Sequence, residues 1–380
     1  MRITFITTME GPPWGGSEEL WSQAAVHLVK AGHSVLAAMR QPRREPPRTE
    51  HPKFKALKAA GVQLHLIHQR QKLVRQIFRD PPIQWLLDFK PDLTIISMGW
   101  LFNGAEWMQA LRAAGIPYAI LVQAVNETYR PKDWQAFANS YQHAQCAYFV
   151  AEDNLRAATR LLMARPQAAL VVRNPFQVPY KQPLPWPNED GTTRLAMVAR
   201  IDFPVKGHDL LLETLALPKW RVRKIEVSFF GTGPDLAYFQ QMATFWNLSQ
   251  VHFRGQVSDI ADIWRTHHAL VLPSRVEGTP LAMVEAMLCG RPVIVTNVAG
   301  NAEIAEDGLS GFVAAAPKTE YLDETMERAW ARRSEWPAMG IRAAERARQL
   351  FPEDPGAVFA DTLAGLMPRW PLKQKDDGPE

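Results

Sequence analysis

Residues 271–290, VLPSRVEGTPLAMVEAMLCG, contain the pattern that decides the fold. An apolar run ends near Ser274, a short polar loop follows, and a second, almost wholly apolar run extends to Gly290. Thr279 suits the N-cap of a helix, Pro280 its first position, and Gly290 its end. The stretch therefore predicts a buried strand, a loop and a buried helix, which is the repeating unit of a parallel sheet.

The same strand–helix alternation extends along the chain in both directions. Apolar strand candidates occupy residues 2–7, the surroundings of residue 36, 62–67, 93–97, 118–122, 146–150, 170–172, 195–198, 225–230, 251–254, 269–272 and 293–296. Five prolines fall within residues 175–187 and interrupt the pattern, as expected of a linker. We predict an α/β protein with two doubly wound Rossmann-like domains that face a central cleft.

The predicted boundaries follow from this interruption and from the helical pattern near the C-terminus. We expect a first domain over residues 1–176, a proline-rich linker over 177–190 and a second domain over 191–350. Residues 351–380 are expected to form a helix that returns to the first domain, followed by a polar tail.

Composition excludes several classes of protein. The chain has 380 residues, 47% of them apolar, and a formal net charge of +4, which excludes intrinsic disorder. Cys146 and Cys289 are its two cysteines, too few for a disulfide framework or a four-thiolate zinc site. They favour a reducing, cytoplasmic location. No apolar run reaches the length of about 18 residues that a membrane span requires, although contact with a membrane surface stays open.

Two glutamates stand out in the stretch quoted above. Glu285 is the only charged residue of the predicted apolar helix, and a buried carboxylate needs a partner such as a ligand hydroxyl. Glu277 precedes the start of that helix, where free N–H groups attract anions such as phosphate. The alternative is structural: Glu277 as a partner of the helix dipole and Glu285 as half of an ion pair.

Two cations follow the first predicted strand of the second domain. Arg200 and Lys206 flank a short loop and are suited to grip a diphosphate, the guanidinium as a fork and the ammonium as a point charge. The alternative is that both are solvated surface cations. Their position at the carboxyl end of a strand favours the functional interpretation.

Glycines after two other strands allow the backbone to approach a ligand. Gly15 and Gly16 precede a predicted helix, although a glycine pair also occurs in simple turns. Gly231 and Gly233 follow a strand in the second domain, but Leu236 stands where the third glycine of a dinucleotide fingerprint would be, so this segment does not indicate NAD binding.

Together these motifs resemble the GT-B glycosyltransferases of glycosyltransferase family 4, the group 1 nucleotide-sugar enzymes. The resemblance covers essentially the whole chain and is most specific over residues 195–315. Glu277 and Glu285 match the family's Glu-x7-Glu motif, in which the first glutamate contacts the donor sugar and the second the nucleotide ribose. Arg200 and Lys206 match the family's Arg and Lys that hold the donor diphosphate. Gly231, Gly255 and residues 300–308 match further loops, and Gly15 and Gly16 match the family's opening.

The resemblance implies a retaining transfer of a sugar from a nucleotide diphosphate sugar to a glycan, a lipid-linked or a small-molecule acceptor, without a metal. The catalytic residues would be Glu277, Arg200 and Lys206. The donor site would comprise Gly15, Gly16, Arg200, Lys206, Gly231, Gly255, Gly278, Thr279, Pro280, Leu281 and Glu285. No acidic, histidine or cysteine cluster in the sequence indicates a metal site, so no cofactor is expected, and neither is a nucleic-acid partner.

One departure from the family pattern leaves alternatives open. Many members carry a histidine after the strand at 118–122, where this chain has Gln123, followed by Asn126 and Glu127. A non-catalytic nucleotide-sugar or glycan-binding relative, or an epimerase or phosphorylase of the same architecture, stays an alternative.

The first domain, which handles the acceptor in this fold, contains a basic segment. Residues 40–90 hold 12 Lys/Arg against 4 Asp/Glu, interleaved with aromatic residues. Such a segment can attach a protein peripherally to an anionic membrane or bind an acidic glycan, and a solvated basic face is the equal alternative.

Overall fold

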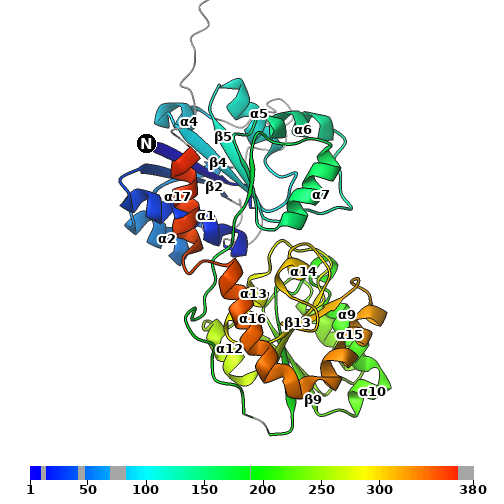
Figure 1. Cartoon of the computed structure of the whole chain (residues 1–380). Coiled ribbons are helices and arrows are strands. Elements are labelled where there is room, and N and C mark those ends of the chain that lie inside the picture. Colours follow the sequence, from blue (N-terminus) through cyan, green and yellow to red (C-terminus); the bar gives the residue numbers. More distant parts are fainter. Residues whose placement is uncertain (10–13, 42–47, 69–82, 189, 367–380) are drawn as a thin grey trace, which may run out of the picture.

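The structure, a computed structural model, describes residues 1–9, 14–41, 48–68, 83–188 and 190–366. In that part of the chain it contains two parallel sheets, each with helices on its faces, stacked as two lobes (Figure 1). The predicted tail after Leu366, and the basic residues Arg43 and Arg44, lie outside the described residues. The α/β prediction with two doubly wound domains is confirmed.

The first sheet has the strand order β3-β2-β1-β4-β5-β6-β7. Its strands pair in parallel, with Phe5 opposite both Ala37 and Ile95. The chain adds β2 and β3 on one side of β1 and β4 to β7 on the other, so the strand order reverses between β1 and β4. In open parallel sheets, ligands bind beside such a point. The elements are β1 Arg2–Thr7, α1 Gly16–Lys30, β2 Ser34–Gln41, η1 Arg48–Glu50, α2 Pro52–Ala59, β3 Gln63–His68, α4 Gln84–Phe89, β4 Leu93–Met98, α5 Ala105–Ala113, β5 Tyr118–Val122, α6 Trp134–Gln142, β6 Ala147–Phe149, α7 Glu152–Leu162 and β7 Ala169–Val171.

The second sheet has the order β10-β9-β8-β11-β12-β13 and is also parallel, with Met197 of β8 opposite Phe229 of β9. Its order reverses between β8 and β11. The elements are β8 Thr193–Val198, α8 Phe203–Lys206, α9 His208–Ala216, α10 Pro218–Arg221, β9 Ile225–Phe230, α11 Leu236–Phe245, β10 Val251–Gly255, α12 Ile260–Thr266, β11 Ala269–Leu272, α13 Leu281–Leu288, β12 Val293–Thr296, α14 Asn301–Ile304, β13 Gly311–Ala314, α15 Thr319–Ala331, η2 Arg333–Glu335 and α16 Trp336–Leu350.

Two details of the sequence prediction differ from the structure. The last strand, β13, was not predicted, because its four residues begin with a glycine and lie at the sheet edge, where a short apolar run is a weak signal. The helix after β11 begins at Leu281, with Pro280 as its N-cap residue. Thr279 is not the N-cap residue and no side chain caps the helix; the hydroxyl of Thr279 donates to the carbonyl of Val150 in the first lobe (2.7 Å).

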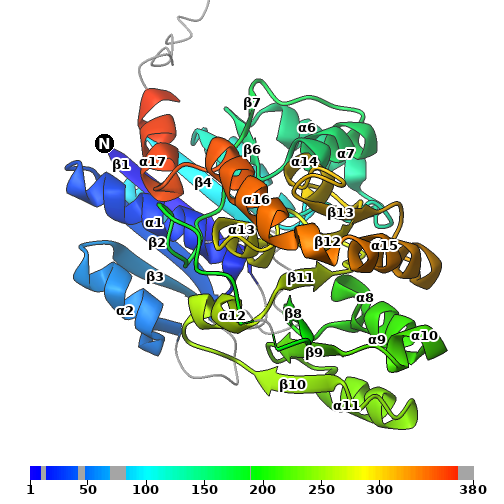
Figure 2. The same cartoon turned by 60° about the horizontal axis from the view of Figure 1, so that its bottom comes forward.

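The chain crosses between the lobes twice. Residues 172–188 and 190–192 form neither helix nor strand and connect β7 to β8. After α16 the chain crosses back, and α17, Pro355–Leu366, packs beside α1 on the first lobe (Figure 1, red beside blue). Phe359 and Leu363 of α17 are buried there with Leu20 and Trp21 of α1. Figure 2, in which the molecule is turned by 60°, shows α16 lying over α13 and the sheet of the second lobe.

Buried apolar strands form the centres of both lobes. Strands β4, β5 and β11 are buried along their whole length, as expected of parallel strands that helices cover on both faces. Cys146 and Cys289 are buried free thiols. Among the described helices, none has the length and apolar character needed to cross a membrane.

Candidate functional site

A cavity of ≈ 1010 Å³ lies between the two lobes, at the carboxyl ends of the strands on either side. Its lining combines loops after β1, β4 and β5 of the first lobe with loops after β8, β9, β10 and β11 of the second. Ten of the predicted site residues line it: Gly15, Gly16, Arg200, Lys206, Gly231, Glu277, Gly278, Thr279, Pro280 and Leu281. Gly255 and Glu285 do not.

The two predicted cations face this cavity already paired with carboxylates. Arg200 follows β8 and forms an ion pair with Asp202, which lies at the start of α8. Lys206, the last residue of α8, places its Nζ 2.7 Å from Oε1 of Glu277. Each cation thus has a carboxylate partner; the Arg200 side chain is 54% exposed and the Lys206 side chain 23%. The diphosphate contact of both stays a prediction.

Asp202 is a site residue that the sequence prediction missed. It is 7% exposed and lines the cavity. A signal was present, because residues two apart on an extended segment project to the same side, which places Asp202 beside Arg200. Asp202 has the extended dihedral angles that this argument needs (φ −142°, ψ 109°).

Glu277 is the second buried carboxylate that lines the cavity. Its Oε1 accepts hydrogen bonds from Lys206 Nζ and from Ser274 Oγ (2.6 Å), and its side chain is 5% exposed. Leu281 and Ala282, the first residues of α13, line the same cavity. Because the first N–H groups of a helix lack intrahelical partners, this end supplies positive potential next to Lys206 and Arg200. The arrangement can stabilise a negatively charged leaving group.

Glu285 has a partner that was not predicted. Its Oε1 accepts a hydrogen bond from the backbone N–H of Gln177, in the connection between the lobes (3.0 Å). Among the described residues no cation pairs with Glu285, so the structure does not contain the ion pair of the structural alternative. Burial raises the pKa of Glu285 to about 7, opposed by the Gln177 hydrogen bond and assisted by the charge of Glu19. The ribose contact stays a prediction from the family resemblance.

Glycines of the cavity wall, Gly231 and Gly278 among them, have no room for a side chain. Gly231 has φ +133°, and a Cβ there would lie 2.1 Å from the carbonyl oxygen of Ala199. A Cβ on Gly278 would lie 1.8 Å from the carbonyl oxygen of Gln123, in the opposite lobe. The loop that carries Glu277 therefore touches the first lobe directly, which requires glycine at this point.

Gln123, at the position where the resemblance led us to look for a histidine, is held in a fixed orientation. Its Oε1 accepts from Nδ2 of Asn174 (2.8 Å), and its Nε2 lies 3.4 Å from the carbonyl oxygen of Ser17. Gln123 and Asn174 are 7% and 4% exposed and both line the cavity. The sequence prediction missed Asn174, which lies 51 residues away from Gln123 along the chain.

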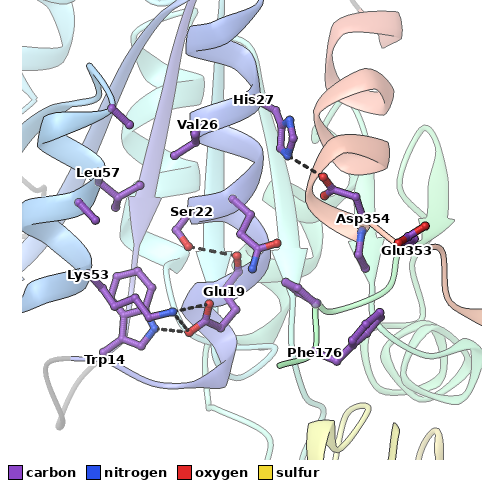
Figure 3. Close-up of a pocket in the computed structure, with 15 residues that line it drawn as sticks. Trp14, Glu19, Ser22, Val26, His27, Lys53, Leu57, Phe176, Glu353 and Asp354 are labelled. Atoms are coloured by element: carbon purple, nitrogen blue, oxygen red, sulfur yellow. Dashed lines mark hydrogen bonds and ion pairs between the residues drawn. The ribbon is translucent and has the colours of Figure 1, made fainter. Parts of the chain in front are cut away.

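A second cavity of ≈ 820 Å³ lies beside the first, where both connections between the lobes meet α1 and α2. Trp14, which lines both cavities, donates from Nε1 to Glu19 Oε1 (2.7 Å), and Lys53 pairs with the same carboxylate (3.0 Å; Figure 3). On its other side, His27 Nε2 lies 3.0 Å from Oδ2 of Asp354 (Figure 3). None of the predicted site residues lines this second cavity.

The described residues contain no group of three or more His, Cys, Asp or Glu side chains that could hold a metal ion. Positive charge in the first cavity is supplied by Arg200 and Lys206. Metal independence stays a prediction, with its test given below.

Comparison with known proteins agrees with this geometry. Residues 192–332, which include all strands of the second sheet, match the family described as glycosyl transferases group 1. An uncharacterized glycosyltransferase of Methanocaldococcus jannaschii is 34% identical over 115 residues, 29% of this chain and 31% of that protein. The N,N'-diacetylbacillosaminyl-diphospho-undecaprenol alpha-1,3-N-acetylgalactosaminyltransferase of Campylobacter jejuni is 28% identical over 137 residues, 36% of this chain and 35% of that protein. The matches thus span about a third of these relatives' lengths.

Solved structures extend the likeness to both lobes. Anabaena HepE, determined in complex with UDP, superposes with a TM-score of 0.75 at 17% identity, covering 96% of this chain and 100% of HepE. At this identity the comparison shows the fold. The chain therefore has the GT-B fold of the group 1 glycosyltransferases, and its residues 192–332 match that family.

Proposed function

We propose that this chain is a glycosyltransferase that moves a sugar from a nucleotide diphosphate sugar to a glycan, a lipid-linked or a small-molecule acceptor. The observation that carries the proposal is the placement of Arg200, Lys206, Glu277 and the start of α13 around one cavity. These groups suit a diphosphate that gains charge as the sugar–oxygen bond breaks. The UDP complex of HepE and the lipid-linked acceptor in the name of the Campylobacter relative support the proposed donor and acceptor classes.

Retention of the anomeric configuration is part of the proposal. An inverting displacement needs a general base that deprotonates the acceptor as it attacks. Among the described residues that line the cavity, the carboxylates are Asp202 and Glu277, and each is paired with a cation; no histidine lines it. This lining supports a mechanism in which Glu277 orients the sugar or stabilises its cationic centre. The cations stabilise the leaving group.

The experiment that tests the proposed function is a thermal-shift screen against UDP, GDP and ADP and their sugars. A nucleotide that binds the folded state raises the melting temperature by mass action. The donor selected in this way is then supplied with a panel of acceptors, and the anomeric configuration of the product is determined by NMR. Binding without turnover would identify a non-catalytic relative. The absence of any nucleotide-dependent shift would contradict the proposal.

Chelation is expected to leave the transfer rate unchanged. Arg200, Lys206 and the start of α13 provide the positive potential that Mg²⁺ or Mn²⁺ provides in metal-dependent enzymes. Initial rates should therefore agree with and without EDTA. A loss of activity that Mg²⁺ or Mn²⁺ restores would contradict metal independence.

Membrane attachment, if it occurs, should be electrostatic and released by salt. In the described part of the basic segment, Lys53 pairs with Glu19 and Lys55 with Glu50 (2.9 Å), whereas Lys58 lies exposed on α2. The ion pairs reduce the net charge that α2 offers to anionic lipid, and exposed charges are screened within about 10 Å at 0.1 M salt. Flotation with anionic and with neutral liposomes at two ionic strengths measures this. Binding that ignores lipid charge or salt would contradict it.

The carboxyl group of Glu285 should make stability depend on pH. Burial raises its pKa to about 7, above the value of 4.5 expected for an unfolded chain, so the folded state holds the proton more tightly. The contribution of this protonation to the free energy of unfolding is fully present below pH 4.5 and is lost as the pH rises through 7. The free energy of unfolding should therefore fall less between pH 5 and pH 8 in Glu285→Gln than in the parent protein. Urea unfolding at both pH values measures the difference, and equal losses would contradict the prediction.

A further inference from the structure

Helix α7 begins at the boundary between the lobes without a capping side chain of its own. Its N-cap residue is Ala151, which has no side-chain acceptor for the helix's first N–H groups. These groups have no intrahelical partners, and a Ser, Thr, Asp or Asn at the N-cap commonly satisfies one of them. The partner here comes from the other lobe.

Glu303 of α14 caps this helix from the second lobe. Its Oε2 accepts from the backbone N–H of Glu152 (3.0 Å), and its Oε1 from that of Asp153 (2.5 Å). The Glu303 side chain is 18% exposed, and Arg156, one turn into α7, places Nη2 3.8 Å from Oε1. A carboxylate at a helix N-terminus is stabilised by the helix dipole and by charge-assisted hydrogen bonds. These two hydrogen bonds, between residues 150 and 151 apart in the sequence, are called the Glu303 clasp below.

The Glu303 clasp lies directly beside the loop that carries Glu277. Thr279, two residues after Glu277, donates its hydroxyl to the carbonyl of Val150, immediately before the N-cap of α7. Gly278 packs against the carbonyl of Gln123, and its own carbonyl accepts from the N–H of Gly300, three residues before Glu303. The Glu277 loop is therefore enclosed between the strand ends of the first lobe and the segment that carries Glu303.

We propose that Glu303 is a positioning residue: its clasp holds the two lobes together and thereby seats the Glu277 loop against the first lobe. The carboxylate takes no part in either hydrophobic core, so its removal leaves each sheet intact. What is lost is a pair of charge-assisted hydrogen bonds that exist only when the lobes are in contact. The effect on lobe contact stands by itself, and the effect on transfer rests on the proposed function.

The first test measures contact between the lobes without using activity. Hydrogen–deuterium exchange reports the amides at the start of α7, and small-angle X-ray scattering reports the separation of the lobes. In Glu303→Ala the amides of Glu152 and Asp153 should exchange about tenfold faster, as expected when one capping interaction is lost. The radius of gyration should increase. Glu303→Gln keeps one acceptor oxygen and should give a smaller change.

A matched control lies three residues further along the chain. Glu306 is also an acidic residue of the second lobe, but it pairs with Arg346 of α16 in its own lobe (3.4 Å). Glu306→Ala should leave both the exchange at α7 and the scattering as in the parent. Exchange and scattering that are unchanged in Glu303→Ala, or changed equally in Glu306→Ala, would overturn the clasp.

The second test asks whether the clasp positions the reaction. With the donor identified by the screen above, Glu303→Ala should lower kcat/KM about tenfold, while calorimetric affinity for the nucleoside diphosphate changes less than about twofold, because Arg200 and Lys206 lie within the second lobe. A purely structural role would reduce both together. Unchanged kcat/KM despite faster exchange would overturn the positioning role. If no nucleotide sugar of the screen binds or reacts, the proposed function is contradicted. The exchange result would still test the Glu303 clasp, because it does not depend on a donor.

Discussion

Arg200→Ala and Lys206→Ala should each weaken binding of the nucleoside diphosphate by about ten- to a hundredfold. Both cations line the cavity between the lobes, and charge-assisted hydrogen bonds of this kind contribute roughly 1.5–3 kcal/mol each. Because the leaving diphosphate gains charge in the transition state, the loss in kcat/KM should exceed the loss in ground-state affinity. The two effects should not simply add, since both side chains meet the same ligand.

Calorimetry with the diphosphate and with the bare nucleoside separates this effect from general damage to the site. Loss of a cation that holds phosphate should weaken binding of the diphosphate and leave binding of the bare nucleoside unchanged. Arg194 provides a matched control, because it lies in β8, the strand that Arg200 follows, and pairs with Asp190 rather than lining the cavity. If Arg200→Ala and Lys206→Ala weaken the nucleoside as much as the diphosphate, or leave both unchanged in a folded protein, the assignment is wrong.

Glu277→Ala should lower kcat by about a hundred- to a thousandfold, as observed when one preorganised electrostatic group is removed from an active site. Donor affinity should be maintained or increased. The reason is the ion pair: Lys206 Nζ lies 2.7 Å from Glu277 Oε1, and removing the carboxylate leaves the ammonium group available to the phosphates. Lys206→Ala should instead lower both the affinity and kcat, so the two partners of one ion pair are expected to differ in their effect on binding.

Steady-state kinetics together with calorimetry measure this difference. Ser274→Ala is the control, because it removes the other hydrogen bond to Oε1 of Glu277 and leaves the ion pair in place. Its effect on kcat should stay well below that of Glu277→Ala, because it removes one charge-assisted hydrogen bond and leaves the carboxylate itself in the site. A Glu277→Ala protein that mainly loses donor affinity, or that loses no more activity than Ser274→Ala, would contradict the assigned role.

Much of the fold was predictable because parallel strands between two helix layers form continuous apolar runs. Strands such as β5 and β11 consist entirely of buried residues and need no alternation to be recognised. The N-cap of α13 was assigned wrongly because the helix begins one residue later than the residue types indicate, with Pro280 at the N-cap; the hydroxyl of Thr279 donates to Val150 of the first lobe.

The candidate site was predictable to the extent that it lies at strand ends. Arg200, Lys206 and Glu277 were identified because each follows a strand, and such positions converge on the cavity of an open parallel sheet. The pairing of Lys206 with Glu277 was not predictable. Lys206 and Glu277 are 71 residues apart, and only the adjacency of β8 and β11 brings their loops together.

The sequence by itself determined the two parallel sheets and placed Arg200, Lys206 and Glu277 near strand ends, because apolar runs and strand-end positions are local patterns. Only the tertiary structure decided that Glu285 accepts from Gln177 of the linker, that Asn174 orients Gln123, and that Glu303 caps α7. Each of these contacts joins residues that are 51 to 151 positions apart. They depend on how separately folded segments lie against one another, and no local periodicity or spacing encodes that placement.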